Sequence, residues 1–124
     1  LHDNTHSFPT RRSSDLTAHI TAPKVDPSNV PSTMSKIILT DKLRGELGYQ
    51  GIIITDGMEM GAITKQYKPG DAAIQAILAG VDIILIPYDY TNTFDAVVKA
   101  VEDGLISEER LNQSLSRILT AKGF

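Results

Sequence analysis

GIIITDG, residues 51–57, is the most informative stretch of the chain. Ile52, Ile53 and Ile54 form a continuous β-branched run, which is typical of a strand buried on both faces. Strands of this kind belong to parallel sheets whose faces are covered by helices. Asp56 follows the run almost at once, where the carboxyl end of the strand is expected. The stretch therefore predicts an α/β fold with a carboxylate at the open edge of its sheet.

Helices and a second strand are predicted on both sides of this run. Ser35 is the expected N-cap of a helix over residues 35–47, and Gly48 stands where a left-handed cap would end it. The later pattern predicts a helix over 71–79 opened by Asp71 and closed by Gly80, a buried strand over 81–86, a helix over about 93–102, and a last helix after Ser107. The last two helices carry apolar stripes at Phe94, Val97, Val98 and Val101 and at Leu111, Leu115, Ile118 and Leu119. The alternation indicates a parallel sheet, and so few strands would leave long edges unpaired, so the pattern predicts a piece of a larger domain.

The first sixteen residues, LHDNTHSFPTRRSSDL, have no apolar period and are interpreted as a disordered tail. The run from His6 to Leu16 also resembles one translated reading frame of a short-read sequencing adapter. We therefore exclude residues 1–16 from the fold and expect a partial domain over residues 17–124. The four residues TAHI, 17–20, are expected to end a strand.

Composition excludes several classes of protein. The chain has 41% hydrophobic and 22% charged residues, which is ordinary for a soluble globular domain. Its net charge of −3, without a basic cluster, gives no sign of a nucleic-acid groove or of binding to an anionic membrane. The absence of cysteine excludes disulfides and thiolate metal sites. No apolar run approaches the ~20 residues that a membrane span requires.

Three candidate reactive positions follow predicted strands: His19, Asp56 and the cluster Tyr88-Asp89-Tyr90. Loops converge over this edge of a parallel sheet. A carboxylate held there can attack a sugar carbon or bind a metal, but Asp56 can equally cap the next helix or turn. A structural role is favoured for His19 over a substrate contact. The tyrosine cluster is interpreted as a turn and a helix entry, with the rim of a site as the alternative.

The loop GMEMG, residues 57–61, favours a functional role for Asp56 because its glycines let a ligand approach the backbone. Met58 and Met60 are candidates for an apolar floor, although methionines at this spacing more often fill a core. Glu59 is interpreted as a solvated residue or as a contact of the following helix.

A longer stretch carries a family resemblance. PSTMSKIILTDKLRGELGYQGIIITDGMEMGAI, residues 31–63, and AGVDIILIP, residues 79–87, resemble the catalytic barrel of glycoside hydrolase family 3, and within it the β-N-acetylhexosaminidase branch. The similarity covers nearly all of residues 17–124 and implies the C-terminal portion of an incomplete (β/α)8 TIM-type barrel. Gly57 favours this branch, because the β-glucosidase branch usually has tryptophan after the aspartate.

The resemblance implies that Asp56 is the nucleophile of a retaining β-glycosidase acting on terminal β-linked N-acetylhexosamine or glucose-type residues. His19 and Met60 are its candidate substrate contacts. The general acid/base of the branch is a His-Asp pair in a KHFPGHGD-like loop, which this sequence lacks. The expected partners are therefore a carbohydrate and the missing N-terminal half of the barrel, and the chain alone is expected to be inactive. No metal or organic cofactor is implied.

Two alternatives come from other classes of protein. A phosphoacceptor receiver domain also ends a buried strand in an aspartate, but it needs an acidic pair after the first strand and a lysine after a later one, and neither is evident here. The other alternative is a half-barrel that binds a ligand without catalysis.

Overall fold

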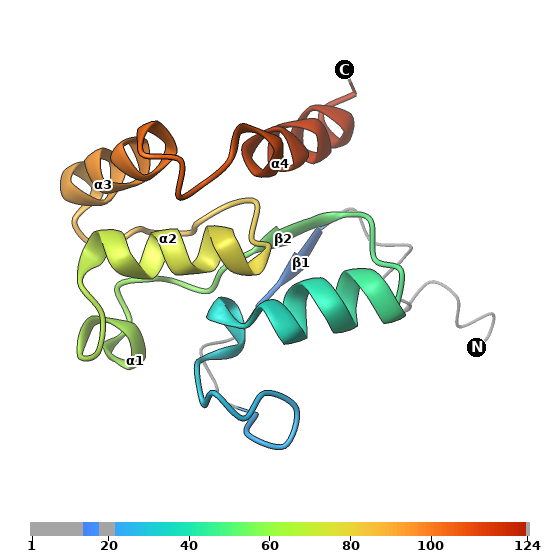
Figure 1. Ribbon diagram of the computed structural model, residues 1–124, viewed down its shortest axis with the longest axis horizontal. Coiled ribbons are helices and arrows are strands. Elements are labelled where there is room, and N and C mark those ends of the chain that lie inside the picture. Colours follow the sequence, from blue (N-terminus) through green and yellow to red (C-terminus); the bar gives the residue numbers. More distant parts are fainter. Residues whose placement is uncertain (1–13, 18–21, 124) are drawn as a thin grey trace.

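The structure is a computed structural model that describes residues 14–17 and 22–123. Its elements in chain order are β1 (Ser14–Leu16), η3 (Ser32–Met34), η4 (Ile37–Glu46), β2 (Ile52–Ile54), α1 (Gly61–Thr64), α2 (Pro69–Ala79), α3 (Tyr90–Glu102) and α4 (Glu108–Ala121). In Figure 1 the two strands run between η4 and α2, and α3 and α4 form a further row beyond α2. The described residues are mostly helical, and they close no barrel.

The sheet is parallel, as expected for a buried isoleucine run. β1 pairs with β2 in the register Ser14↔Ile52 to Leu16↔Ile54. The pairing continues past β1, because the Thr17 N–H donates to the Ile54 carbonyl at 2.8 Å. The predicted strand end at 17–20 is thus described only at Thr17, and residues 18–20 lie outside the described part. β1 lies within residues 1–16, which the sequence pattern had led us to exclude from the fold.

The predicted strand over residues 81–86 is wrong as a regular element. The structure has a single parallel bridge there, between Ile54 and Ile83. The ladder stops because the next amide, that of Leu85, donates to the side chain of Thr55 (N···Oγ1 2.8 Å) and not to a main-chain carbonyl. Ile86 then adopts a left-handed φ of 45°, which an extended strand does not permit.

The helix predicted over 35–47 is present but is a π-helix, η4, whose Leu47 N–H donates to the Lys42 carbonyl five residues back. Its predicted ends are confirmed by local geometry. The Ser35 Oγ accepts the Ile38 N–H at 3.1 Å, as an N-cap does, and Gly48 has a φ of 70°.

The three longer helices also start and stop close to their predicted bounds. α2 begins at Pro69, two residues before the expected Asp71, because proline is well tolerated at the first helical position. Gly80, with a φ of 125°, ends α2 as predicted. The Ser107 hydroxyl caps α4 by accepting the Arg110 N–H at 3.1 Å. Asp89, with a φ of 53°, caps α3, which therefore starts at Tyr90, three residues earlier than expected.

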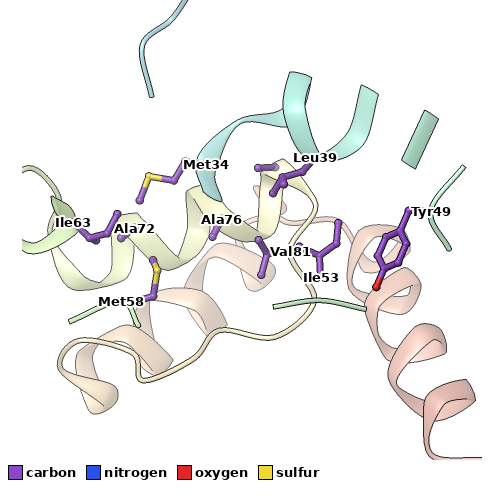
Figure 2. Packing of buried hydrophobic residues seen from close by; sticks show 10 residues of the cluster. Met34, Leu39, Tyr49, Ile53, Met58, Ile63, Ala72, Ala76 and Val81 are labelled. Carbon is purple, nitrogen blue, oxygen red and sulfur yellow. The ribbon is translucent and has the colours of Figure 1, made fainter. Parts of the chain in front are cut away.

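The core lies where η4, β2 and α2 meet. Figure 2 shows Leu39 of η4 and Ile53 of β2 directed toward Ala76 of α2 and Val81. The alanines of α2 keep that helix close to its neighbours. The contact between α2 and α3 is closest at Gly70, where an added Cβ would lie 2.3 Å from the Cβ of Ala96.

The apolar stripes of α3 and α4 are only partly covered. Phe94 is 55% exposed, and Leu115 and Leu119 are exposed as well. Val98 is exposed too, whereas Val97, Val101, Leu111 and Ile118 are partly buried, so about half of each stripe forms exposed apolar surface. None of the described helices is long and apolar enough to cross a membrane.

Candidate active site

Asp56 lies two residues after the end of β2, at the carboxyl edge shared by the two parallel strands. Its side chain is half-buried, and Thr55 immediately before it is fully buried. The Oδ1 atom accepts the N–H of Gly57 at 2.8 Å. Among the described residues Oδ2 has no hydrogen-bond partner. One carboxylate oxygen is thus held by the backbone and the other is available to a ligand.

The alternative in which Asp56 caps the next helix is not observed. That helix, α1, begins at Gly61, and its N-cap is Met60, with no side-chain hydrogen bond. Among the described residues its side chain bonds only to the turn that directly follows it, through the Gly57 N–H. The half of the alternative that assigned Asp56 to a turn is therefore observed, and the half that assigned it to the cap of α1 is not.

The loop after Asp56 separates the roles of its two methionines. Met58 is 2% exposed and belongs to the core cluster, which confirms the interpretation as core filler (Figure 2). Met60 is 43% exposed, so it does not fill the core. Glu59 is exposed, as predicted, and its Oε2 lies 2.7 Å from the place that a Cβ on Gly57 would take. The missing side chain at position 57 therefore makes room for the Glu59 carboxylate beside Gly57.

The other candidate positions differ in what the structure says of them. His19 lies outside the described residues. The Tyr88-Asp89-Tyr90 cluster forms the turn and helix entry that the sequence predicted, because Asp89 caps α3. Tyr90 stacks on Phe94, with ring centroids 6.1 Å apart, and both rings line a pocket of about 200 Å³ together with Ile84 and Pro87.

The sequence profile described as "Glycosyl hydrolase family 3 N terminal domain" matches residues 12–121, which is most of the chain. The chain belongs to glycosyl hydrolase family 3. This membership does not favour the interpretation as a phosphoacceptor receiver domain.

Individual members of the family agree with this assignment. A solved β-N-acetylglucosaminidase of family 3 from Paenibacillus sp. FPU-7 is 44% identical, covers 90% of this chain and superposes with a TM-score of 0.85. β-Hexosaminidase A of Pseudoalteromonas piscicida is 37% identical over 86% of the chain. The β-N-acetylglucosaminidase/β-glucosidase of Cellulomonas fimi is 29% identical over 75% of it. The chain spans only 22%, 21% and 16% of these three proteins.

This family 3 chain contains a buried ionic cluster that the sequence reasoning missed. The carboxylate of Asp82 is fully buried and accepts from Arg44 Nη2 at 2.7 Å and Arg117 Nη1 at 2.9 Å. It also accepts from the Ser114 hydroxyl at 2.6 Å and the Ile53 N–H at 3.0 Å. The only sequence signal was an acidic residue inside the apolar run 81–86, because a buried charge requires partners.

The ionic cluster joins three parts of the family 3 chain around the middle of β2. Arg44 comes from η4, and Ser114 and Arg117 come from α4. Burial lowers the pKa of the Arg44 guanidinium, and the attraction of Asp82 opposes that shift. Asp82 bonds to Ile53 in the middle of β2, whereas Asp56 lies beyond the carboxyl end of that strand.

A second buried carboxylate, Asp26, fastens the proline-containing loop to η4. It accepts the Ser28 N–H at 2.9 Å, the Ser28 hydroxyl at 2.6 Å and the Ser35 hydroxyl at 2.5 Å. These bonds, the Ser28 hydroxyl first among them, lower the pKa of Asp26 below its ordinary value. Since Ser35 also caps η4 through the Ile38 N–H, the loop and the helix start are coupled.

The lowered pKa of Asp26 predicts an acid-labile contribution to stability. A carboxylate whose pKa is lower when folded stabilises the fold fully above its unfolded pKa of about 4, and this contribution is lost as the pH falls through the folded pKa. The difference in thermal midpoint between the wild type and Asp26→Asn should thus be constant from pH 7 to about 5 and shrink below about 4. Ser28→Ala should weaken the same pH dependence. A difference that grows on acidification would contradict the assignment.

Proposed function

We propose that this chain is part of a retaining β-glycosidase that releases terminal β-linked N-acetylhexosamine, with Asp56 as the nucleophile. The observation that carries the proposal is the position of Asp56 at the carboxyl edge of β2 in a chain 44% identical to a β-N-acetylglucosaminidase. We propose further that residues 17–124 are the C-terminal portion of a (β/α)8 barrel. We place residues 1–16 outside the native domain on sequence grounds, although Ser14–Leu16 pair with β2 as β1 and the family match begins at residue 12. TIM-barrel-like neighbours support the barrel assignment, and the chain spans only 22% of the solved relative.

The proposed reaction is a double displacement. Oδ2 of ionised Asp56 attacks the anomeric carbon, the glycosidic C–O bond breaks, and the leaving oxygen takes a proton from an acid outside this chain. Water then attacks the same carbon and gives its proton back to the group outside this chain that acted as the acid; the bond to Asp56 breaks, Asp56 leaves as a carboxylate, and the sugar keeps its configuration. The hydrogen bond from the Gly57 N–H to Oδ1 supports this role, because it orients the carboxylate and leaves Oδ2 open. The exposure of Met60 is compatible with a substrate contact, and His19 is proposed for the same role on sequence grounds alone.

A β-glucosidase activity is the second candidate, since the Cellulomonas relative is named for both activities. The identity of residue 57 favours the N-acetylhexosamine substrate, because glycine and not tryptophan follows Asp56. The side chain of Glu59 occupies the space that a tryptophan at position 57 would enter, so a glucosidase-like residue there would displace it. Comparison of aryl β-N-acetylglucosaminide and aryl β-glucoside turnover would separate the two candidates.

The test of this function uses a chimera as well as the chain itself. The 124-residue chain alone should not turn over an aryl β-N-acetylglucosaminide, because the proposed acid/base lies outside it. Residues 17–123 should restore turnover when they replace the matching segment of the Paenibacillus enzyme. An activated 2-fluoro sugar should then label the peptide that contains Asp56, as mass spectrometry would show. Label on another residue, or inversion of the anomeric configuration, would exclude the proposed mechanism.

A further inference from the structure

The hydrogen bonds between β2 and residues 83–85 change register just before Asp56. In a regular parallel ladder the amides and carbonyls of one strand alternate with those of its neighbour. The pair begins in this way: the Ile83 N–H donates to the Ile53 carbonyl at 3.2 Å, and the Thr55 N–H donates to the Ile83 carbonyl at 3.0 Å. Regular continuation would pair the Leu85 N–H with the Thr55 carbonyl and the Gly57 N–H with the Leu85 carbonyl.

The structure has neither of these bonds. The Leu85 N–H donates to the Thr55 Oγ1 at 2.8 Å, and the Leu85 carbonyl accepts from Met58 at 3.1 Å, one residue later than in a regular ladder. The hydroxyl of Thr55 has replaced its own main-chain carbonyl as the acceptor. One extra residue is accommodated between the two bonds, as in a β-bulge, a feature that redirects side chains near active sites.

The register change frees the amide that holds the proposed nucleophile. The Gly57 N–H, which a regular ladder would give to Leu85, donates to the Oδ1 of Asp56 at 2.8 Å. Asp56 and Gly57 thus form a two-residue arch that is anchored on both sides, at Thr55 and at Met58, to the same residue, Leu85. Both anchors are buried, since Thr55 is 0% and Met58 2% exposed. The arch is therefore anchored at both ends to buried residues.

We propose that Thr55 is a positioning residue, whose hydroxyl shifts the register of the ladder and so fixes the orientation of the Asp56 carboxylate. The inference rests on the proposed function of Asp56. The proposal predicts different effects for serine and valine at position 55, because only one of them has a hydroxyl oxygen. Serine retains the acceptor oxygen, whereas valine has nearly the same shape as threonine and has no acceptor. With valine, the part-buried Leu85 amide loses the Thr55 hydroxyl as its acceptor and either goes without a protein partner or moves to the Thr55 main-chain carbonyl, which draws Gly57 away from Asp56.

Amide hydrogen exchange on the 124-residue chain tests the structural half of this inference. In Thr55→Val, exchange at Leu85 should become at least about tenfold faster, or protection should pass from the Met58 amide to that of Gly57. Thr55→Ser should exchange like the wild type. Thr93→Val is a matched control, because it removes a buried hydroxyl of α3 that donates to the Tyr88 carbonyl and makes no hydrogen bond to Thr55, Leu85 or Met58. Unchanged exchange at both Leu85 and Met58 in Thr55→Val would overturn the proposal.

Kinetics of the chimera test the catalytic half. Thr55→Val should lower kcat by about 10- to 100-fold, because small misplacements of a reacting group cost rates of this order, while KM changes less than about threefold. Thr55→Ser should recover kcat to within about threefold of the wild type, and Thr93→Val should leave it unchanged. A Thr55→Val chimera with normal kcat would overturn the positioning role. Labelling of another residue by the 2-fluoro sugar would contradict both the proposed function and the catalytic role of Thr55. The hydrogen-exchange result would still test whether the Thr55 hydroxyl shifts the register of the ladder.

Discussion

Asp56→Ala should lower kcat/KM of the chimera by about 10⁴-fold or more, which is the usual consequence of removing a covalent nucleophile. The substitution deletes the attacking oxygen and the acceptor of a single local hydrogen bond to Gly57. Because Asp56 is half-buried and caps no helix, the chimera should still fold. Steady-state kinetics with an aryl β-N-acetylglucosaminide, together with circular dichroism of the same preparation, would measure both effects.

Glu59→Gln is the matched control for this prediction. Glu59 is the other carboxylate of the loop, and its Oε2 lies 2.7 Å from the place that a Cβ on Gly57 would take. Its neutralisation should change kcat/KM by less than about tenfold, since it has no assigned part in bond making. Added azide should restore turnover to the Asp56→Ala chimera by occupying the vacated position, and should not accelerate Glu59→Gln. The reverse pattern would identify Glu59 as the nucleophile.

Asp82→Ala should be the most destabilising single substitution considered for this chain, at about 3–5 kcal/mol, because it leaves the other members of a buried charge cluster unpaired. Arg44 and Arg117 would lose their carboxylate partner, and the Ile53 N–H would lose its acceptor. Since total stability of a small domain is only about 5–15 kcal/mol, the cooperative urea transition should weaken greatly or disappear.

Asp103→Ala provides the comparison for Asp82. Asp103 pairs with Lys99 four residues away on α3, and both side chains are exposed. Such a pair contributes about 0.5 kcal/mol or less, so the urea midpoint should hardly move. Equal effects of the two substitutions would show that the Asp82 cluster does not stabilise the fold.

The local features of the fold could be predicted from the sequence. The caps at Ser35, Gly48, Gly80 and Ser107 depend on residues within one turn of the chain, and the structure confirms them. The isoleucine run also predicted a parallel strand correctly. Consecutive isoleucines place apolar side chains on both faces of a strand, which is typical of a parallel sheet covered on both sides.

Features that depend on distant side chains could not be predicted. The prediction of a strand over 81–86 was wrong because the Leu85 N–H donates to the hydroxyl of Thr55, which lies 30 residues earlier in the chain. Asp82 gave no sign of its partners, since Arg44 precedes it by 38 residues and Arg117 follows it by 35. Hydrophobic periodicity carries no information about which polar group will replace a backbone partner.

The candidate site also has features that could be predicted from the sequence and features that could not. The place of Asp56 after β2 and the core position of Met58 followed from pattern and composition. The arch at Asp56 and Gly57 did not, because it arises from a register change in a neighbouring segment. Nucleophile and substrate contacts remain predictions, with His19 outside the described residues.

The close approach of α2 and α3 has a consequence for how this family 3 sequence can vary. Gly70 and Ala96 together have room for a single methyl group at their contact, since a second one would lie 2.3 Å away. The space between the two positions therefore holds only one small side chain. A larger residue at either position requires glycine at the other or a wider separation of the helices. Substitutions at these sites should be accepted in pairs, although 26 residues separate them in the chain.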